Sequence, residues 1–311
     1  MQKPKVIVIL GTTATGKSDL AVKIAKKMNG EIISADSRQV YKGLDIGTGK
    51  VFRDKKISKS YKLKAINYLH KGIPHHLIDV ANPKRKFTVA EYQKKAIYAM
   101  AEIVKKGKTP IICGGTGFYI DAITKGTIFP QVPPNIKLRK LLEKKSVSEL
   151  LKMLEKLDKK RAKDIKDKNE INNKVRLIRA IEIAKALNKV PKITQGNPVY
   201  EFIKIGLYLP QEKLKKKIEK RVKKMFADGL LNEIKKLKKP ARRGESGVSQ
   251  KRLSELGFEY NNPTYERVVK ESVKYAKRQM TWFKRDKEIK WFDASTKNLE
   301  KSVLSKLKKD F

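Results

Sequence analysis

The segment Gly11-Thr12-Thr13-Ala14-Thr15-Gly16-Lys17-Ser18 decides the fold, because it directly follows the apolar run Val6-Ile7-Val8-Ile9-Leu10. It matches the phosphate-loop pattern G-x-x-x-x-G-K-[ST], placed between a buried strand and an amphipathic helix. The glycines let backbone N–H groups turn toward phosphate oxygens, and the start of the next helix favours negative charge. Lys17 supplies a cation for the outer phosphate, and the Ser18 hydroxyl can ligate Mg²⁺. We therefore predict that residues 11–18 bind a phosphorylated compound.

Strand and helix signals alternate along the first part of the chain. We expect strands at residues 6–10, 31–34 and 110–113, with another at 76–80. Helices are expected at residues 17–28 and from a capping box at Thr88 to about residue 106. This alternation predicts an α/β fold, a P-loop NTPase-like parallel sheet flanked by helices. Ligands bind beyond the carboxyl ends of such strands, so the loops after residues 10, 34 and 113 should converge on one site.

A helical insertion is expected in the middle of the chain. Pro130, Pro133 and Pro134 interrupt the alternation, and residues 135–189 have helical character with a second capping box from Ser146 to Glu149. We predict a catalytic core of residues 1–129 and 198–311 and an all-helical insertion at residues 130–197. In the second part of the core we expect strands at 201–209 and 289–292. Helices are expected at 211–226 and about 264–285.

The charge of the chain is extreme. It carries 75 Lys and Arg residues against 32 Asp and Glu residues, a formal net charge of +43. Such a field would hold nucleic acid, but lysine predominates, and a compositional bias of the source genome explains that equally well. The single cysteine, Cys113, excludes a disulfide framework and leads us to expect a cytoplasmic protein. No apolar stretch reaches membrane-spanning length, so we expect no membrane association.

Several blocks, taken in order, resemble the tRNA dimethylallyltransferases, also called tRNA isopentenyltransferases. Besides the phosphate loop, they include Asp36-Ser37-Arg38-Gln39-Val40-Tyr41, Asp45-Ile46-Gly47-Thr48 and the segment 72–79. The resemblance continues through Gly114-Gly115-Thr116-Gly117-Phe118-Tyr119, Arg176-Leu177-Ile178-Arg179-Ala180-Ile181-Glu182 and Ala276-Lys277-Arg278-Gln279-Met280-Thr281-Trp282-Phe283. These blocks span nearly the whole chain.

The resemblance implies transfer of a dimethylallyl group from dimethylallyl diphosphate to N6 of adenosine 37, beside the anticodon of tRNA. Residues 11–18 would then hold the diphosphate, with Mg²⁺ on Ser18, and the target adenine would leave the anticodon-loop stack. Asp36 resembles the family's base, and Thr116 and Lys17 are implied in catalysis. The tRNA anticodon stem-loop would contact both units of a monomer, through Asp36, Ser37, Arg38, Gln39, Thr116, Arg139, Arg176, Arg179 and Arg278.

The chain departs from the family pattern at three positions. Thr12 stands where proline is usual, Gly49 where alanine is usual and Phe258 where tyrosine is frequent. Only the third removes a hydroxyl contact. We also expect Trp282 and Phe283 to be core residues, Cys113 to be a packed strand-end residue, and His70, His75 and His76 to make a poor metal set.

Three other functions compete with tRNA prenylation. A free-nucleotide isopentenyltransferase shares the phosphate loop and a similar His-His-Leu segment, but the long insertion and residues 176–179 favour tRNA. A small-molecule kinase would place ATP in the loop and use Asp36 to deprotonate a hydroxyl. A non-catalytic nucleic-acid-binding protein would account for the charge but not for the converging strand ends.

Overall fold

The computed structural model describes residues 2–54, 68–240 and 246–311. They form two compact units, the first made of Met1–Gly126 with Asn197–Phe311 and the second of Thr127–Gly196. Among the described residues, no helix is both long enough and apolar enough to cross a membrane.

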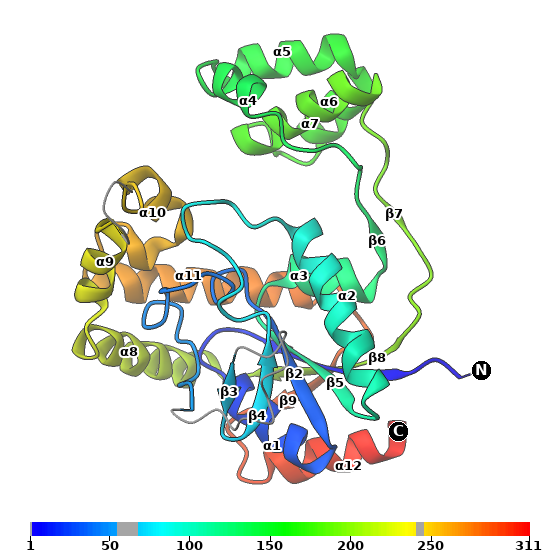
Figure 1. Ribbon diagram of the computed structural model, residues 1–311, viewed down its shortest axis with the longest axis vertical. Helices are drawn as coiled ribbons and strands as arrows, with labels where there is room; N and C mark the ends of the chain where they lie inside the picture. Colours follow the sequence, from blue (N-terminus) through cyan, green and yellow to red (C-terminus); the bar gives the residue numbers. More distant parts are fainter. Residues whose placement is uncertain (1, 55–67, 241–245) are drawn as a thin grey trace. The chain divides into compact units, whose positions relative to one another are not determined.

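A seven-stranded sheet forms the centre of the first unit (Figure 1). Its strand order is β3-β4-β2-β5-β1-β8-β9, and every neighbouring pair is parallel except β3 with β4. The strands are β1 (Lys5–Gly11), β2 (Gly30–Ala35), β3 (Leu69–His70), β4 (Ile73–His76), β5 (Thr109–Gly114), β8 (Glu201–Tyr208) and β9 (Lys290–Asp293). The predicted P-loop NTPase-like parallel sheet is therefore confirmed.

The side chains of β1 show why helices cover both faces of this sheet. Val6, Val8 and Leu10 point into one core cluster, shared with α2 (Val89–Lys105) and α3 (Gly117–Thr124). Ile7 and Ile9 point into the opposite cluster, shared with α1 (Lys17–Lys27) and α12 (Leu299–Asp310), which lie side by side (Figure 1). A strand that is apolar at every position can be buried only between two layers of helices.

The remaining helices of the first unit follow β8. The long α8 (Gln211–Ala227) packs against α11 (Tyr265–Phe283) through Ile218, Val222, Val268 and Ala276. Along the chain, α8 is followed by α9 (Leu230–Lys238), α10 (Gln250–Leu256) and a 3-10 helix at Phe258–Tyr260, which precede α11.

One predicted strand was wrong. The strand expected at residues 76–80 is β4, which covers Ile73–His76 and pairs with β2 at Ile32 and Ile33. Leu77 and Asp79 have φ values of 62° and 57°. These left-handed conformations end the extended backbone, and an apolar pattern does not reveal them.

The second unit is mainly helical. It consists of α4 (Ile136–Glu143), α5 (Val147–Leu157), α6 (Lys159–Asp167) and α7 (Lys174–Leu187), which share one apolar core. The capping box at Ser146 and Glu149 begins α5 as predicted. A short antiparallel ladder, β6 (Thr127–Ile128) with β7 (Thr194–Gln195), closes its base and was not predicted from the sequence.

A buried carboxylate stabilises the edge of the sheet. Only 1% of the Glu31 side chain is exposed, and its oxygens lie 2.7 Å from His76 Nε2 and 2.9 Å from Lys108 Nζ. Burial alone would raise the pKa of Glu31, but hydrogen bonds from His76 and Lys108 outweigh burial and lower it to about 2. A carboxyl whose pKa is lowered by folding stabilises the folded state above its unfolded pKa, and this stabilisation is lost as the pH falls.

We predict that Glu31→Gln lowers the free energy of unfolding at pH 7 and removes part of its pH dependence. Between pH 5 and pH 3 the difference in the free energy of unfolding between wild type and variant should shrink by about 2 kcal/mol. In this range Glu31 takes up a proton in the unfolded chain but stays ionised in the folded protein, which favours unfolding of the wild type. Urea denaturation at several pH values measures this difference. A constant difference across the range would show that folding does not lower the pKa of Glu31.

Candidate active site

The phosphate loop leaves β1 at a point of close backbone approach. Gly11 has φ 142°, and a Cβ atom there would lie 2.2 Å from the Leu207 carbonyl oxygen of β8. Only glycine fits this position. Within the loop, Thr15 Oγ1 donates to the Thr12 carbonyl oxygen at 2.8 Å, and Lys17 Nζ donates to the same oxygen at 2.5 Å. The loop is therefore curled upon itself, with Lys17 folded back over it.

A cavity of about 400 Å³ lies at the carboxyl ends of β1, β2 and β5. The predicted convergence of the three loops is thus present. Its walls include Thr13, Lys17, Ser18, residues 36–39, 47–49 and 113–115, and from the second part of the chain Arg221, Glu259, Tyr275, Arg278 and Gln279.

Asp36 lies at the end of β2 and faces this cavity. Its Oδ1 atom accepts hydrogen bonds from the N–H groups of Arg38 at 2.8 Å and Gln39 at 3.3 Å. Within the described part of the chain, Oδ2 has no hydrogen-bond donor. One oxygen therefore orients the carboxylate while the other is available to a ligand.

Thr116 joins the ends of β5 and β2. Its Oγ1 accepts from the Ser37 N–H at 3.0 Å, and it donates to Ser37 Oγ at 3.3 Å. Thr116 also begins α3 as its N-cap residue. The predicted residues Asp36, Ser37, Arg38, Gln39 and Thr116 therefore form one group at the cavity.

Two residues that the sequence did not single out fix the phosphate loop from the other side. Arg221 of α8 donates to Thr13 Oγ1 at 2.8 Å and to the Thr48 carbonyl oxygen at 3.0 Å. Gln279 of α11 accepts from the Thr13 N–H at 2.8 Å and donates to the Gly115 carbonyl oxygen at 2.8 Å. The helical spacing of α8 could not single out Arg221, because the helix is rich in basic residues that face solvent.

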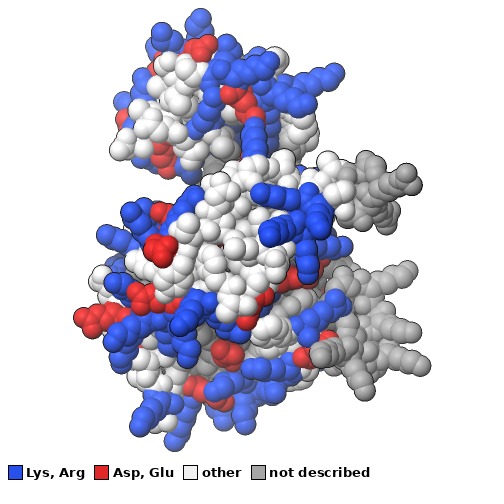
Figure 2. Space-filling model, turned by 90° about the vertical axis from the view of Figure 1, so that its left-hand side faces the viewer, with Lys and Arg blue, Asp and Glu red and all other residues white. Residues whose placement is uncertain are grey.

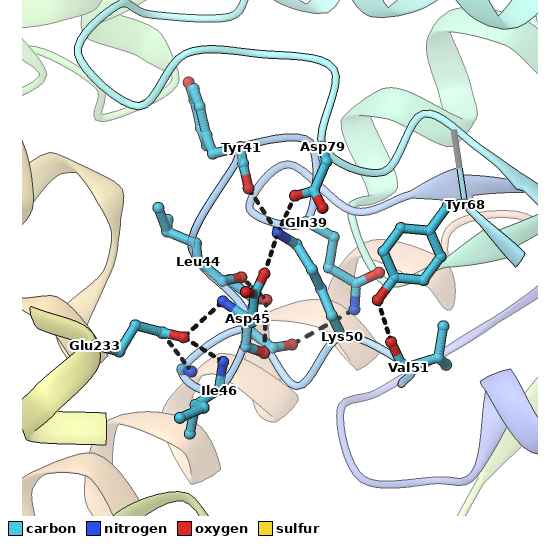
Figure 3. A network of polar contacts seen from close by, with 12 residues as sticks. Gln39, Tyr41, Leu44, Asp45, Ile46, Lys50, Val51, Tyr68, Asp79 and Glu233 are labelled. Atoms are coloured by element: carbon cyan, nitrogen blue, oxygen red, sulfur yellow. Dashed lines mark hydrogen bonds and ion pairs between the residues drawn. The ribbon is translucent and has the colours of Figure 1, made fainter. Parts of the chain in front are cut away.

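The segment 44–50 forms a further wall, held by two buried charged residues (Figure 3). Glu233 of α9 accepts from the N–H groups of Asp45 at 2.8 Å, Ile46 at 2.7 Å and Gly47 at 3.1 Å, and from Tyr260 Oη at 2.8 Å. Lys50 Nζ, whose side chain is 1% exposed, binds Asp45 Oδ1 at 2.8 Å, the Tyr41 carbonyl oxygen at 2.7 Å and the Asp79 carboxylate. These contacts fix the backbone that carries Gly47, Thr48 and Gly49.

The pKa values of three groups in the cavity are displaced. The pKa of Lys17 is lowered to about 8, mainly by burial. Nearby Arg221 also lowers this pKa, while Cys113 and Asp36 partly oppose the change. Burial raises the pKa of Glu259 to about 7 and that of the Cys113 thiol to about 11. Cys113 is therefore a packed thiol, as predicted. An anionic ligand in the cavity would favour the protonated, charged form of the Lys17 amine.

The residues present fit a magnesium ion that a bound phosphate helps to hold. Ser18 and Asp36 both line the cavity and offer a hydroxyl and a carboxylate oxygen. Among the described residues no group of three or more His, Cys, Asp or Glu side chains could hold a metal by itself. Mg²⁺ commonly binds through one or two protein ligands, substrate phosphates and water, so this donor set is sufficient. Of the histidine pair, His76 binds Glu31 through Nε2 at 2.7 Å.

The predicted arginines of the second unit are tied to carboxylates within it. Arg139 binds the buried Glu182 through Nε at 2.8 Å and Nη2 at 2.6 Å, and Arg179 binds the same carboxylate. Burial alone would raise the pKa of Glu182, but hydrogen bonds from Arg139, the Asn135 N–H and Arg179 lower it. Arg176 instead binds Glu170. Arg139 and Arg179 therefore contribute to the core of this unit, whatever else they bind.

The excess of basic side chains is broadly spread. On the face seen in Figure 2, Lys and Arg side chains are scattered among neutral ones, with fewer Asp and Glu side chains between them. On this face the charge by itself therefore marks no single patch.

Comparison with known proteins identifies relatives over nearly the full chain. The family model described as IPP transferase matches residues 39–286. The tRNA dimethylallyltransferase of Halothermothrix orenii is 39% identical, with 98% of this chain and 93% of the relative covered. That of Anoxybacillus flavithermus is 38% identical, with 93% and 90% covered.

Solved structures give the same result. The full-length tRNA isopentenylpyrophosphate transferase of Bacillus halodurans has a TM-score of 0.63 at 32% identity. The match covers 99% of this chain and 98% of the Bacillus halodurans chain. A eukaryotic dimethylallyltransferase acting on tRNA has a TM-score of 0.69 at 27% identity. The match covers 97% of this chain and 77% of the eukaryotic chain.

The lowered pKa of Lys17 predicts that binding of a diphosphate weakens at high pH. A bound anion favours the protonated amine, so binding above about pH 8 must take up a proton. The dissociation constant of a simple alkyl diphosphate, whose own ionisations are complete well below this pH, should rise about tenfold per pH unit there. Calorimetric titration from pH 7 to 9.5 measures it. Lys17→Arg, which stays charged, should flatten the profile, and an unchanged slope in this variant would exclude Lys17 as the titrating group.

Removing the Glu233 carboxylate should destabilise the protein. In the wild type, three backbone N–H groups donate to the Glu233 carboxylate. Glu233→Gln replaces this carboxylate with a neutral amide, and we expect a loss of about 1–3 kcal/mol in the free energy of unfolding. Glu300→Gln is the matched control, because Glu300 is a partly exposed carboxylate that forms a surface ion pair with Lys23 at 3.1 Å. The control should change stability by less than about 1 kcal/mol. Equal losses in the two variants would contradict the role of Glu233.

Proposed function

The chain belongs to the IPP transferase family, and from this premise we propose that it transfers a dimethylallyl group from dimethylallyl diphosphate to N6 of adenosine 37 in tRNA. The products are N6-isopentenyladenosine and diphosphate. The observation that carries the proposal is the meeting of the phosphate loop and Asp36 at one cavity at the ends of β1, β2 and β5, where Thr116 holds the lining residue Ser37. The cavity thus offers an anion-binding end and a proton acceptor a short distance apart.

The diphosphate of the donor would bind at the phosphate loop. Loop N–H groups, Lys17 and the guanidinium of Arg221 all lie on that side of the cavity. When the bond between C1 of the dimethylallyl group and its oxygen breaks, the electron pair leaves with the diphosphate. Fixed positive groups stabilise that developing charge, and burial makes them more effective than they would be in water.

Asp36 would accept the proton of the reacting amine. The adenine N6 lone pair is delocalised into the ring, so this amine is a weak nucleophile and a weak base. Once N6 has formed its bond to C1, the nitrogen is strongly acidic, and an ordinary carboxylate can take the proton. The N–H groups of Arg38 and Gln39 hold the carboxylate through Oδ1, so we assign the proton to Oδ2. Thr116 positions Ser37, which lines the same cavity.

Ser18 and Asp36 would hold Mg²⁺ together with oxygens of the diphosphate. When bound, it adds positive charge beside the leaving group. The phosphate loop, Lys17 and Arg221 supply the remaining contacts from the protein.

The tRNA would present its anticodon stem-loop to both units. The target adenine must leave the base stack to reach the cavity, and Arg278 at the cavity wall offers a cation to the neighbouring phosphate. Arg139, Arg176 and Arg179 of the second unit are proposed phosphate contacts, although Arg139 and Arg179 share Glu182. Since the cavity is built by one chain, we propose that the enzyme acts as a monomer.

The test is transfer from labelled dimethylallyl diphosphate, with Mg²⁺, to an anticodon stem-loop that contains the target adenine. AMP and ATP serve as parallel acceptors. We expect label on the stem-loop alone and a loss of at least about 100-fold in kcat with Asp36→Asn, which keeps the hydrogen bonds to residues 38 and 39 but cannot accept the proton. Label on AMP or ATP alone would identify a free-nucleotide enzyme. Phosphate transfer from ATP to a small molecule would identify a kinase.

A further inference from the structure

One face of α11 continues beyond the cavity. Tyr275, Arg278, Gln279 and Trp282 are spaced by three and four residues, so they share one face of the helix. The first three line the cavity. Trp282 lies one turn further along, about 6 Å from the level of Arg278. A ligand that emerges from the cavity along α11 therefore meets Trp282 next.

Two aromatic side chains are exposed at this place. The sequence predicted Trp282 and Phe283 to be core residues, and this is right for Phe283 at 2% exposure but wrong for Trp282 at 36%. Phe118 is 44% exposed, and its ring centroid lies 6.3 Å from that of Trp282 at an interplanar angle of 67°. Phe118 is the second residue of α3, two residues after the N-cap Thr116, so it too belongs to the segment that follows β5.

The backbone is shaped to hold this pair. A Cβ atom at position 117 would lie 2.3 Å from Trp282 Cδ1, so only glycine lets the indole pack so closely against the start of α3. The indole of α11 thus packs against the start of α3, the helix that Thr116 caps. Fixed aromatic rings lose little conformational entropy when they bind a partner.

Positive charge accompanies the rings. The Arg285 guanidinium lies 5.7 Å from the Trp282 ring centroid, and that of Arg278 lies 5.8 Å from the Tyr275 ring centroid. Aromatic rings beside guanidinium groups, in line with a cavity, are the combination that binds unpaired nucleotides, since each base offers a flat face and each phosphate a charge. Two rings are too small a surface for a stable protein partner.

We propose that Phe118 and Trp282 form a stacking platform for the unpaired base next to the target adenine in the RNA substrate. This inference rests on the proposed function and adds a second base-binding subsite to it. Extraction of the adenine leaves its neighbour without a stacking partner, and the platform replaces that partner while Arg278 and Arg285 meet the connecting phosphates. The platform would therefore lower the cost of taking the adenine out of the stack.

Fluorescence tests the stacking directly. The chain has two tryptophans, and Trp291 lies in β9, so Trp291→Phe leaves Trp282 as the only indole. Titration with an anticodon stem-loop should quench this fluorescence, as stacked bases do. Two matched stem-loops are then compared, one without the base on the 5′ side of the target adenine and one without the base on its 3′ side. One of the two should quench the fluorescence of Trp282 much less than the other. Equal quenching by both, or none with the intact stem-loop, would overturn the proposal.

Kinetics with three variants separates stacking from folding. Phe118→Ala and Trp282→Leu should each raise the KM for the stem-loop about tenfold and leave the KM for dimethylallyl diphosphate unchanged. Trp282→Tyr should largely restore the first KM, and melting temperatures identify any variant that fails to fold. Tyr98→Ala is the matched control, because Tyr98 is an aromatic residue of α2 that is 63% exposed and lies outside the cavity lining.

The two proposals fail in different ways. If the wild-type enzyme does not prenylate the stem-loop, the proposed function is wrong. If it does, and both alanine and leucine variants keep the wild-type KM for the stem-loop, the function stands and the platform is wrong.

Discussion

The parallel pairing of β2, β5 and β1 is the constraint on which the rest of this structure depends. Because the three strands run in the same direction, they end at one edge of the sheet, and each ends in a segment with a different chemistry. β1 leads into the anion-binding loop, β2 into Asp36 and β5 into Thr116. Burial of the sheet on both faces makes this arrangement rigid, so the site inherits its precision from the core.

Much of this arrangement could be predicted from the sequence, and the reason is physical. The phosphate loop between an apolar strand and a helix determines a parallel sheet, and the capping boxes at Thr88 and Ser146 begin helices where the pattern places them. The end of β4 could not be predicted, because it depends on left-handed residues with ordinary apolar and acidic side chains. The ladder between β6 and β7 is too short to leave a periodic signal.

The site shows the same division. Residues close in sequence to the strand ends, such as Asp36 and Thr116, could be identified because the topology alone brings them together. Arg221 and Gln279 could not, because they reach the phosphate loop from helices more than 200 residues away in the chain, 208 for Arg221 and 266 for Gln279. Arg221 is the single arginine among the lysines of α8, but neither this nor the helical spacing shows that it turns toward the phosphate loop. Tertiary packing alone supplies that information.

The turn at residues 45–47 has a consequence for ligand selection. Its three N–H groups converge on one carboxylate, in the manner of a backbone anion nest. This family member therefore contains two backbone cradles for anions: Glu233 fills the one at residues 45–47, and the phosphate loop lines the cavity. The phosphate loop is therefore the backbone cradle that remains open to an anionic ligand, at one end of the cavity.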